Sequence, residues 1–554
     1  MLLDLFDHQK NVVDEAIKSP NKAIILPMGF GKTIIGLALA IKRFQETQTP
    51  SLVICSKTLL VSWISEIRKF STSTTKIKYE VCHREHLGGA IDSWRPRPET
   101  QLVLTTPEVA VMSYIQGMVQ EQFIFNVDDR IIEYRLTTNP WSRIHQGVGV
   151  LHSTTWASVL IDEAQNYNNC ETKRCRAIAS LATNVRWLLS GTLFQEPPVR
   201  RFLGFFLLLG QQEPRNLSAC SLFIRNEQFT GFRSYCIERS DNPVFKGVEC
   251  QTKIVAHDMS GEEKLCYSLL VKIMQDLCHQ YNIARINTDR IETRRIRGCI
   301  LAMWTYLRQA LVSPLLPVSQ LLTKIQKDDS DERSSDYISN ACQKVFHTHN
   351  LTEWLHSEDA GNSSRLKQVK QLVKKHPKNK IIIFGSFVTS LKLTKEFLGD
   401  QILTYILHGE MSTSQRQQVL HQFAQSDQAA ILFLTYQIGS EGLNLQFANV
   451  VIHLDLYWNS GKEDQAVARV FRYGQVNPIV HQYILISPTY LEKVMLEKQK
   501  GKVDIIQQLR QGPLTISTKV ATLSIKEMQQ IIKGEDVTCL ANLYRTPEGR
   551  KTIT

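Results

Sequence analysis

The chain has 554 residues, of which 43% are hydrophobic and 21% charged, and its formal net charge is +12. This composition is typical of a globular protein with several domain-sized units, and it excludes a disordered or fibrous chain. No run of 18 apolar residues occurs, and the twelve cysteines form no C-x-x-C pair. We therefore expect no membrane partner, no structural zinc and a reducing intracellular compartment.

The first expected element is an amphipathic helix within residues 1–20. Its apolar residues recur at helical spacing, at Val12, Val13, Ala16 and Ile17. Gln9 comes near its start, and a glutamine amide both donates and accepts hydrogen bonds. Such a group is suited to reading the edge of an adenine base.

Residues 24–35 predict a strand, a phosphate-binding loop and a helix. Gly29 and Gly31 allow backbone N–H groups to face a phosphate, and the helix that follows adds its positive dipole end. Lys32 would then reach the phosphates, and the Thr33 hydroxyl would hold Mg²⁺. Leu26 stands where the strict pattern has a glycine. Taken alone, the segment is also compatible with a glycine-rich turn before a helix.

Short apolar runs alternate with helical patterns up to about residue 195. The runs are residues 52–55, 102–105, 159–161 and 187–189. This alternation predicts a doubly wound parallel sheet, in which ligands bind at the carboxyl ends of the strands. Residues 110–156 interrupt the alternation and are expected to form a surface insertion.

Two adjacent carboxylates, Asp162 and Glu163, follow the third of these runs. One would coordinate Mg²⁺ and the other would activate water. Acidic pairs are common in loops without function, but the phosphate loop about 130 residues upstream favours the two-part arrangement of a P-loop ATPase.

Residues 196–345 predict long helices and a linker, and the segment 326–364 is polar. A second alternating region follows, with apolar runs at residues 380–384, 402–407, 431–434, 450–454 and 483–486 and without a phosphate loop of its own. A helix is expected at 490–508. The expected domains are a first lobe at 1–195, helical protrusions and linker at 196–345, a second lobe with a brace helix at 346–510, and a tail at 511–554.

The stretch from Gln465 to Gln475 contains Arg469 and Arg472, which would share one face of a helix. Periodicity alone favours a solvated basic face. An arginine pair in a lobe without a phosphate loop is also suited to reaching ATP held by the other lobe.

Together these motifs resemble the Swi/Snf-type ATPases of helicase superfamily two. The matches occur in order along nearly the whole chain, and the more diagnostic ones lie at residues 307–310, 314–316, 442–445, 458–459 and 465–475. The Asp-Glu-Ala-Gln box is most similar to the post-replication-repair translocases and the Lodestar-like termination factors. A chain that begins at the first motif resembles the compact ATPases of large DNA viruses. Departures from the family pattern are Leu26-Pro27, Leu193-Phe194 and Ser440-Glu441.

The resemblance implies an α/β fold of two RecA-like lobes with helical insertions and an ATP cleft between them. It implies ATP and Mg²⁺ as cofactors. The residues expected to bind the nucleotide are Gln9, Met28, Gly29, Phe30, Gly31, Lys32, Thr33, Gly442 and Gln465. The expected catalytic residues are Lys32, Asp162, Glu163, Gln195, Arg469 and Arg472, with Thr33 and Asp162 at the metal.

Nucleic-acid phosphates are expected to contact side chains that follow the strands, namely Lys57, Thr58, Thr105, Thr106, Ser386 and Thr435. The basic runs 290–297 and 365–380 would widen this track or form solvated helix faces.

The leading function is a double-stranded DNA translocase that displaces bound proteins or restructures DNA, in the nucleus or at a viral replication site. The alternatives are a strand-separating DNA or RNA helicase, for example one acting with a transcription complex, and a nucleotide-gated binding module with little turnover.

Overall fold

The computed structural model describes residues 5–27, 29–71, 76–87, 94–116, 122–127, 130–135, 149–191, 199–211, 213–226, 229–239, 248–328, 338, 342, 363–439, 443–472, 474–512 and 552–553. The chain divides into two compact units. The first comprises Met1–Lys246 and Gly501–Ala521, and the second comprises Gly247–Lys500 and Thr522–Thr554.

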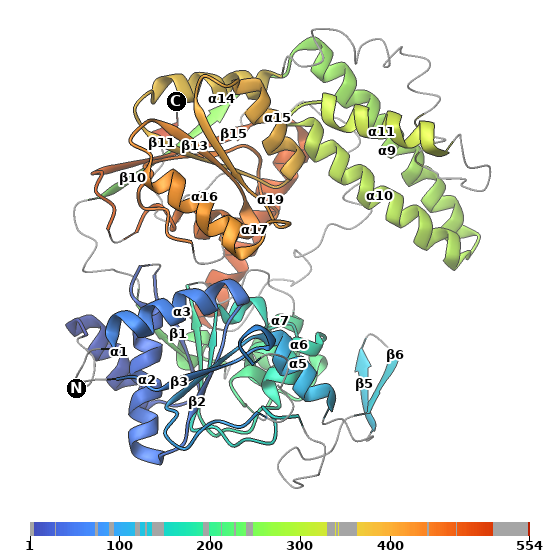
Figure 1. The fold of residues 1–554 in the computed structure, drawn as a ribbon. Coiled ribbons are helices and arrows are strands. Elements are labelled where there is room, and N and C mark those ends of the chain that lie inside the picture. Colours follow the sequence, from blue (N-terminus) through green and yellow to red (C-terminus); the bar gives the residue numbers. More distant parts are fainter. Residues whose placement is uncertain are drawn as a thin grey trace. The chain divides into compact units, whose positions relative to one another are not determined.

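The first unit contains a seven-stranded sheet in the order β3-β4-β2-β7-β8-β1-β9, in which all pairs are parallel (Figure 1). Its strands are β1 (Lys22–Ile25), β2 (Ser51–Ile54), β3 (Tyr79–Cys82), β4 (Leu102–Thr105), β7 (Val159–Asp162), β8 (Arg186–Ser190) and β9 (Cys236–Glu238). The predicted strands are confirmed. The edge strands β3 and β9 were not predicted because each buries a single residue and leaves no apolar run.

Helices cover both faces of this sheet, because alternate residues of its strands point into two separate cores. The core that contains Ile24 and Val53 includes Val12 of α1 (Asp7–Lys18), Leu37 of α2 (Lys32–Thr47) and Trp63 of α3 (Lys57–Phe70). The core that contains Leu52 is covered by α6 (Lys173–Ala179), α7 (Val199–Leu208) and α8 (Leu217–Arg225). The doubly wound architecture is therefore confirmed. Shorter elements are α4 (Arg84–Leu87), α5 (Pro107–Gln116), η1 (Ala164–Asn166) and η2 (Phe232–Tyr235).

Part of the segment expected as a surface insertion is described. Strands β5 (Gln122–Val127) and β6 (Arg130–Arg135) pair with each other in antiparallel fashion and form a sheet of their own. The start of the segment belongs to α5, and its last residues, from 149 onward, pack in the first unit.

The second unit contains another seven-stranded parallel sheet, in the order β12-β13-β11-β14-β15-β10-β16. Its strands are β10 (Glu249–Ala256), β11 (Lys380–Gly385), β12 (Leu403–Leu407), β13 (Ala430–Thr435), β14 (Val450–His453), β15 (Ile479–Ile486) and β16 (Thr552–Ile553). Its helices are α14 (Ser364–Lys375), α15 (Val388–Leu398), α16 (Thr413–Gln425), α17 (Tyr436–Gly439) and α18 (Ser460–Val467). Helix α19 (Tyr490–Gln511) begins in this unit, and its residues from Gly501 onward belong to the first unit. The five predicted strands are confirmed. Strand β10 was missed because Ile254 is its one buried residue.

The long helices expected after residue 196 divide between the two units. Helices α7 and α8 cover the first sheet, whereas α9 (Gly261–Ile286), α10 (Arg290–Ala310) and α11 (Leu315–Asp328) form a helical subdomain of the second unit (Figure 1). The expected boundary at 196 thus falls inside the first unit, since a helical pattern does not tell which surface the helix will cover. No helix in the described ranges is long and apolar enough to cross a membrane.

Candidate functional site

The loop between β1 and α2 has the backbone geometry expected of a phosphate loop. Gly31 caps α2 with φ +89°, and a Cβ at this position would lie 2.4 Å from Nε2 of Gln9. Gln9 holds the loop: its Nε2 donates to the carbonyl of Phe30 at 3.1 Å, and its Oε1 accepts from the N–H of Phe6 at 3.1 Å. A glutamine amide has two N–H groups and two lone pairs on its oxygen, so one of each remains for a purine.

Lys32 and Thr33 begin α2 directly after the loop. The Nζ of Lys32 donates to the carbonyl of Leu26, at the end of β1, over 3.3 Å. The charge of Lys32 also favours the ionised form of Asp162. The structure thus brings together the lysine and the acidic pair that were predicted from separate motifs.

Asp162 ends β7 and is 4% exposed. Its Oδ2 accepts from the indole N–H of Trp63 at 2.8 Å, and its Oδ1 accepts from the N–H of Glu163 at 2.9 Å. Burial, and next the charge of Glu163, raise the pKa of Asp162 to about 6. A buried carboxylate of this kind is stabilised by a cation. No pattern in the sequence indicates that Trp63 donates to Asp162.

Glu163 has a left-handed backbone with φ +50°, which costs a residue other than glycine about 1–3 kcal/mol. Its Oε2 accepts from the side-chain amide of Gln165, whose Oε1 in turn accepts from the Ser190 hydroxyl at 2.6 Å. These contacts join the carboxyl ends of β7 and β8. The strained backbone is thus held by a buried hydrogen-bond relay between the ends of two neighbouring strands.

These residues are suited to Mg²⁺, although they offer it only a few protein ligands. The described residues hold no cluster of three or more His, Cys, Asp or Glu that could bind a metal by itself. Mg²⁺ is usually held by one or two carboxylates, with water and substrate phosphates completing its octahedron. The desolvated carboxylate of Asp162 and the hydroxyl of Thr33 are hard oxygen donors of the required kind.

In the second unit, the prediction that Arg469 and Arg472 share one face of a helix is wrong. Helix α18 ends at Val467, and a turn follows, so Arg469 and Arg472 do not share a helical face. Arg469 is 7% exposed, and its carbonyl accepts from the N–H of Leu445 at 3.1 Å. Arg472 is partly exposed and donates to Oδ1 of Asn444 at 2.5 Å. The turn nevertheless places both arginines against the residues 443–445 of another predicted motif.

The other residues predicted to bind the nucleotide lie as follows. Gln465 lies on α18 and is 3% exposed. Gly29 has φ +82°, in keeping with a turn that requires glycine, and Phe30 is buried. Met28, Gln195 and Gly442 lie outside the described residues.

Several hydroxyls predicted to contact nucleic-acid phosphates are not accessible. Thr105 is fully buried and donates to the carbonyl of Cys82 at 2.9 Å, and the side chains of Thr106 and Thr435 are also buried. The reason is that the last residue of a strand, or the one after it, still points into the packed layers. Lys57 is exposed and pairs with Glu85 at 2.5 Å, and the partly exposed Thr58 follows it in the first turn of α3.

Ser386 is committed to contacts within its own unit. Its hydroxyl donates to Oδ1 of Asp455 at 2.9 Å and accepts from Nη2 of Arg308 at 2.8 Å. It therefore links α10 to the strand ends of the second sheet. This arrangement corrects the expectation that its hydroxyl is open to a phosphate.

The second basic run, 365–380, begins with a buried residue. Arg365 is 1% exposed and forms an ion pair with Glu492 of α19, in which its Nη2 donates to both carboxylate oxygens at 2.9 Å. Its Nη1 also donates to the carbonyl of Leu454 at 3.1 Å. Arg365 thus fastens α14 and α19 to the sheet, since a buried arginine is tolerated where its charge is paired.

Comparisons with known proteins agree with this fold. The SNF2-related domain matches residues 8–289, and the helicase conserved C-terminal domain matches residues 364–474. "Putative helicase 172L" of Invertebrate iridescent virus 6 is 26% identical over 90% of this chain and 86% of its own length. The CHD3-type chromatin-remodeling factor CHR7 of Arabidopsis thaliana is 23% identical over 88% of this chain, which spans 35% of that protein.

Among solved structures, the Hef helicase domain of Pyrococcus furiosus is similar with a TM-score of 0.50 and 14% identity. The likeness covers 88% of this chain and 97% of that one, and it supports the two-lobe helicase fold. The match to the SNF2-related domain extends over more than half of the chain. The chain belongs to the SNF2-related family and is a helicase-like ATPase with two RecA-like lobes.

Proposed function

We propose that the protein is an ATP-driven translocase on double-stranded DNA, which restructures DNA or displaces proteins bound to it. The observation that carries the proposal is the assembly of Lys32, Asp162 and Glu163 at the carboxyl ends of β1 and β7. Membership of the SNF2-related family adds support, because relatives bear names of chromatin-remodeling and of DNA repair and recombination proteins.

In the proposed mechanism, Lys32 and the backbone N–H groups of the loop from Gly29 to Gly31 hold the phosphates of ATP. Gln9 retains the loop and offers its remaining N–H group and lone pair to the adenine. Thr33 and Asp162 would hold Mg²⁺, which neutralises charge that develops on the transferred phosphoryl group.

Glu163 accepts a proton from the attacking water in this mechanism. Its carboxylate is positioned by the contact with Gln165, and that contact extends to Ser190. Arg472 supplies positive charge to the phosphoryl group, in the manner of an arginine finger. We assign this role to Arg472 rather than to Arg469, because Arg469 is buried next to Leu445.

Movement along DNA would follow from cycles of nucleotide binding and release. Lys57 and Thr58, at the start of α3, are the predicted phosphate contacts with side chains that reach solvent. Contacts to the phosphate backbone are blind to sequence and leave base pairs intact. Such contacts suit a motor that follows a duplex without opening it.

The experiment that tests the proposal is the ATPase rate with duplex DNA, single-stranded DNA and RNA as separate activators, each at the same nucleotide concentration. Lys32→Ala protein, prepared in parallel, sets the background. Stimulation that is strongest with duplex DNA supports the proposal. Equal or stronger stimulation by RNA or single strands favours the helicase alternative, and no stimulation by any of the three overturns both.

A further inference from the structure

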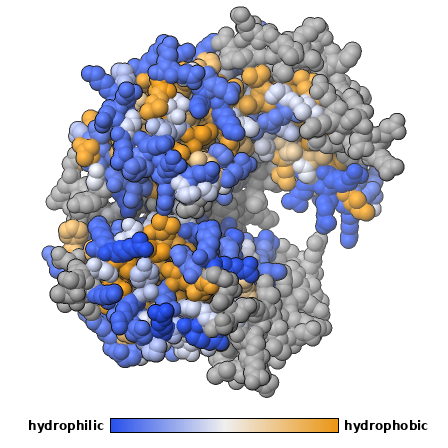
Figure 2. Space-filling view, in the orientation of Figure 1, coloured by the Kyte–Doolittle hydropathy of each residue, from blue (hydrophilic) through white to orange (hydrophobic). Residues whose placement is uncertain are grey.

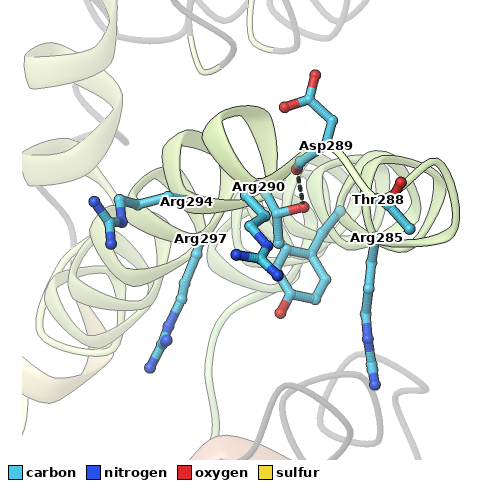
Figure 3. Close-up of a pocket in the computed structure, with 8 residues that line it drawn as sticks. Arg285, Thr288, Asp289, Arg290, Arg294 and Arg297 are labelled. Atoms are coloured by element: carbon cyan, nitrogen blue, oxygen red, sulfur yellow. Dashed lines mark hydrogen bonds between the residues drawn. The ribbon is translucent and has the colours of Figure 1, made fainter. Parts of the chain in front are cut away.

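A basic pocket lies where α9 turns into α10. Its volume is about 400 Å³, and its lining consists of Tyr281, Arg285, Thr288, Asp289, Arg290, Thr293, Arg294 and Arg297 (Figure 3). Arg290, Arg294 and Arg297 recur at helical spacing, so they share one face of α10. Arg285 approaches from the last turn of α9. The sequence left open whether the run 290–297 binds a ligand or forms a solvated face. The structure divides its arginines, because Arg290, Arg294 and Arg297 line the pocket and Arg295 does not.

The four arginines of this pocket have no acidic partner among the residues that the structure describes. All four are exposed. The one acidic residue of the lining, Asp289, caps α10: its Oδ1 accepts from the N–H groups of Ile291 at 3.1 Å and Glu292 at 3.0 Å. Figure 3 shows its carboxylate on the opposite side of the turn from the guanidinium groups of Arg285 and Arg297. The pocket therefore presents four positive charges that no acidic residue in the described ranges pairs with.

The hairpin that carries the pocket is fixed at its base. Glu263, in the first turn of α9, accepts from the N–H of Ser364 at 2.8 Å, at the start of α14. Arg308, in the last turn of α10, donates to Ser386 and to the carbonyl of Leu456 at 3.0 Å. Helix α9 has 26 residues and is about 39 Å long. The pocket is thus held well away from the strand ends of the second sheet by an anchored pair of helices.

We propose that this arginine pocket binds the phosphodiester backbone of a nucleic acid and so provides a contact separate from those at the strand ends. The proposal rests on the proposed function for the class of ligand. Guanidinium groups bind phosphate oxygens in bidentate fashion, and the two threonine hydroxyls add donors. Backbone contacts of this kind position a duplex without reading its sequence.

An acidic protein surface is the competing ligand. Ile286 and Ile291 lie at the same turn and are 79% and 77% exposed, as apolar anchors of a protein interface would be. Figure 2 shows apolar colouring beside the hydrophilic side chains at the end of this hairpin. Neither isoleucine lines the pocket, however, and the walls consist of charged and hydroxyl side chains with a single aromatic ring. These walls favour phosphate over the apolar core that a protein interface requires.

The test measures the affinity of the full chain for a fluorescent DNA duplex over a series of salt concentrations, without ATP. Each lost phosphate contact lowers the slope of log K against log salt by about 0.9 in magnitude. The double variant Arg294→Gln/Arg297→Gln is expected to lose about 1.8 from the slope, equally for duplexes of different sequence. Arg294→Lys/Arg297→Lys, which keeps both charges, should retain most of the slope.

Arg295→Gln is the matched control. Arg295 lies on the same helix and is exposed, but it pairs with Glu292 at 3.9 Å and does not line the pocket. The wild-type slope in this variant, with a reduced slope in the double variant, supports the proposal. Equal slopes in the wild-type and double-variant proteins overturn it. Tighter binding of a polyglutamate peptide than of a duplex of equal charge to the wild-type protein, lost in the double variant, overturns it in favour of an acidic protein partner.

The salt-dependence test of the pocket can fail or succeed independently of the translocase proposal. If duplex DNA does not stimulate the ATPase of the wild-type protein, the translocase proposal fails, whereas the comparison of slopes without ATP still reports on the pocket. Conversely, unchanged slopes with a duplex-stimulated ATPase reject the pocket and leave the translocase proposal in place.

Discussion

The guanidinium of Arg308 donates to the hydroxyl of Ser386 over 2.8 Å, and that hydroxyl donates onward to the buried carboxylate of Asp455. Burial raises the pKa of Asp455, while the charge of Arg308 and the hydrogen bonds from Ser386 act to lower it. Arg308 also lies over the ring of Phe387 at 5.0 Å. One side chain from α10 thus stabilises a charge at the strand ends and fixes the helical subdomain to the second sheet.

The first prediction concerns this connection. Arg308→Ala removes the donor and leaves the carboxylate of Asp455 less compensated, so we expect a loss of about 2 kcal/mol in the stability of the second unit. Thermal unfolding, with hydrogen exchange along α10, measures the effect. The exposed Arg295→Gln on the same helix should change stability by less than about 0.5 kcal/mol. Equal unfolding temperatures for Arg308→Ala and wild-type protein would show that the contact is not stabilising.

The second prediction separates nucleotide binding from hydrolysis. Glu163→Gln keeps the size of the side chain and leaves Asp162 in place, so ATP binding should persist while hydrolysis falls by about 10²-fold or more. Lys32→Ala should instead abolish turnover with the fold intact, because Lys32 contacts the end of β1 and not the core. Fluorescent-nucleotide binding and phosphate release are the two measurements. A parallel loss of binding and turnover in Glu163→Gln would make Glu163 a structural residue.

The third prediction concerns Arg472. Its replacement by alanine should reduce DNA-stimulated turnover far more than ATP binding, since arginine fingers in related phosphoryl transfer contribute about 10³–10⁵ in rate. The partly exposed side chain contacts Asn444, so its removal should leave the fold intact. Arg472→Lys, which keeps the charge without the planar fork, is the matched variant and should recover part of the rate. Full stimulated turnover in Arg472→Ala would assign this residue to a solvated surface.

The fourth prediction is a dependence of stability on pH from Glu463, which is 1% exposed. Burial raises its pKa to about 8, although its Oε1 accepts from the N–H of Tyr457 at 2.6 Å. Between about pH 4.5 and 8 the native state binds a proton that the unfolded chain has lost. Stability from this group is therefore fully present at low pH and decreases as pH rises through this window, by up to about 1.4 kcal/mol per pH unit.

Glu463→Gln cannot ionise. The difference in unfolding temperature, variant minus wild type, should therefore increase from pH 5.5 to pH 7.5. Glu410→Gln, in which an exposed carboxylate is replaced, serves as the control and should follow the wild-type profile. A difference between Glu463→Gln and wild type that stays constant over this range would contradict the assignment.

The sequence predicts the sheets well because buried parallel strands are continuous apolar runs, as in residues 380–384 and 431–434. Strands at or near a sheet edge, such as β9 and β10, carry too little apolar pattern to be found. The phosphate loop and the acidic pair were also predictable, since glycine geometry and adjacent carboxylates are local features of the sequence. The contacts of Trp63 with Asp162 and of Gln165 with Ser190 were not, because they join residues far apart in the chain.

Burial explains why several predicted contact residues are not available to a ligand. Thr105 and Thr435 end strands β4 and β13, where polar residues often meet a ligand, and Arg365 lies in the first turn of α14, yet each side chain is buried in the packed layers. Spacing along the sequence does not tell whether a polar side chain at the end of a strand points outward. Nor did it show that α18 ends before Arg469, since the segment contains neither glycine nor proline between residues 462 and 473.

The central claim is movement on duplex DNA without separation of its strands. The connection between α17 and β14, residues 440–449, contains the motif at 442–445 and is too short for an inserted wedge hairpin. The most direct measurement is a pair of assays on one preparation with ATP: displacement of a third strand from a triplex, and separation of a forked duplex. The account predicts triplex displacement, abolished in Glu163→Gln, with no opening of the fork. Efficient fork opening would contradict it and would establish the helicase alternative.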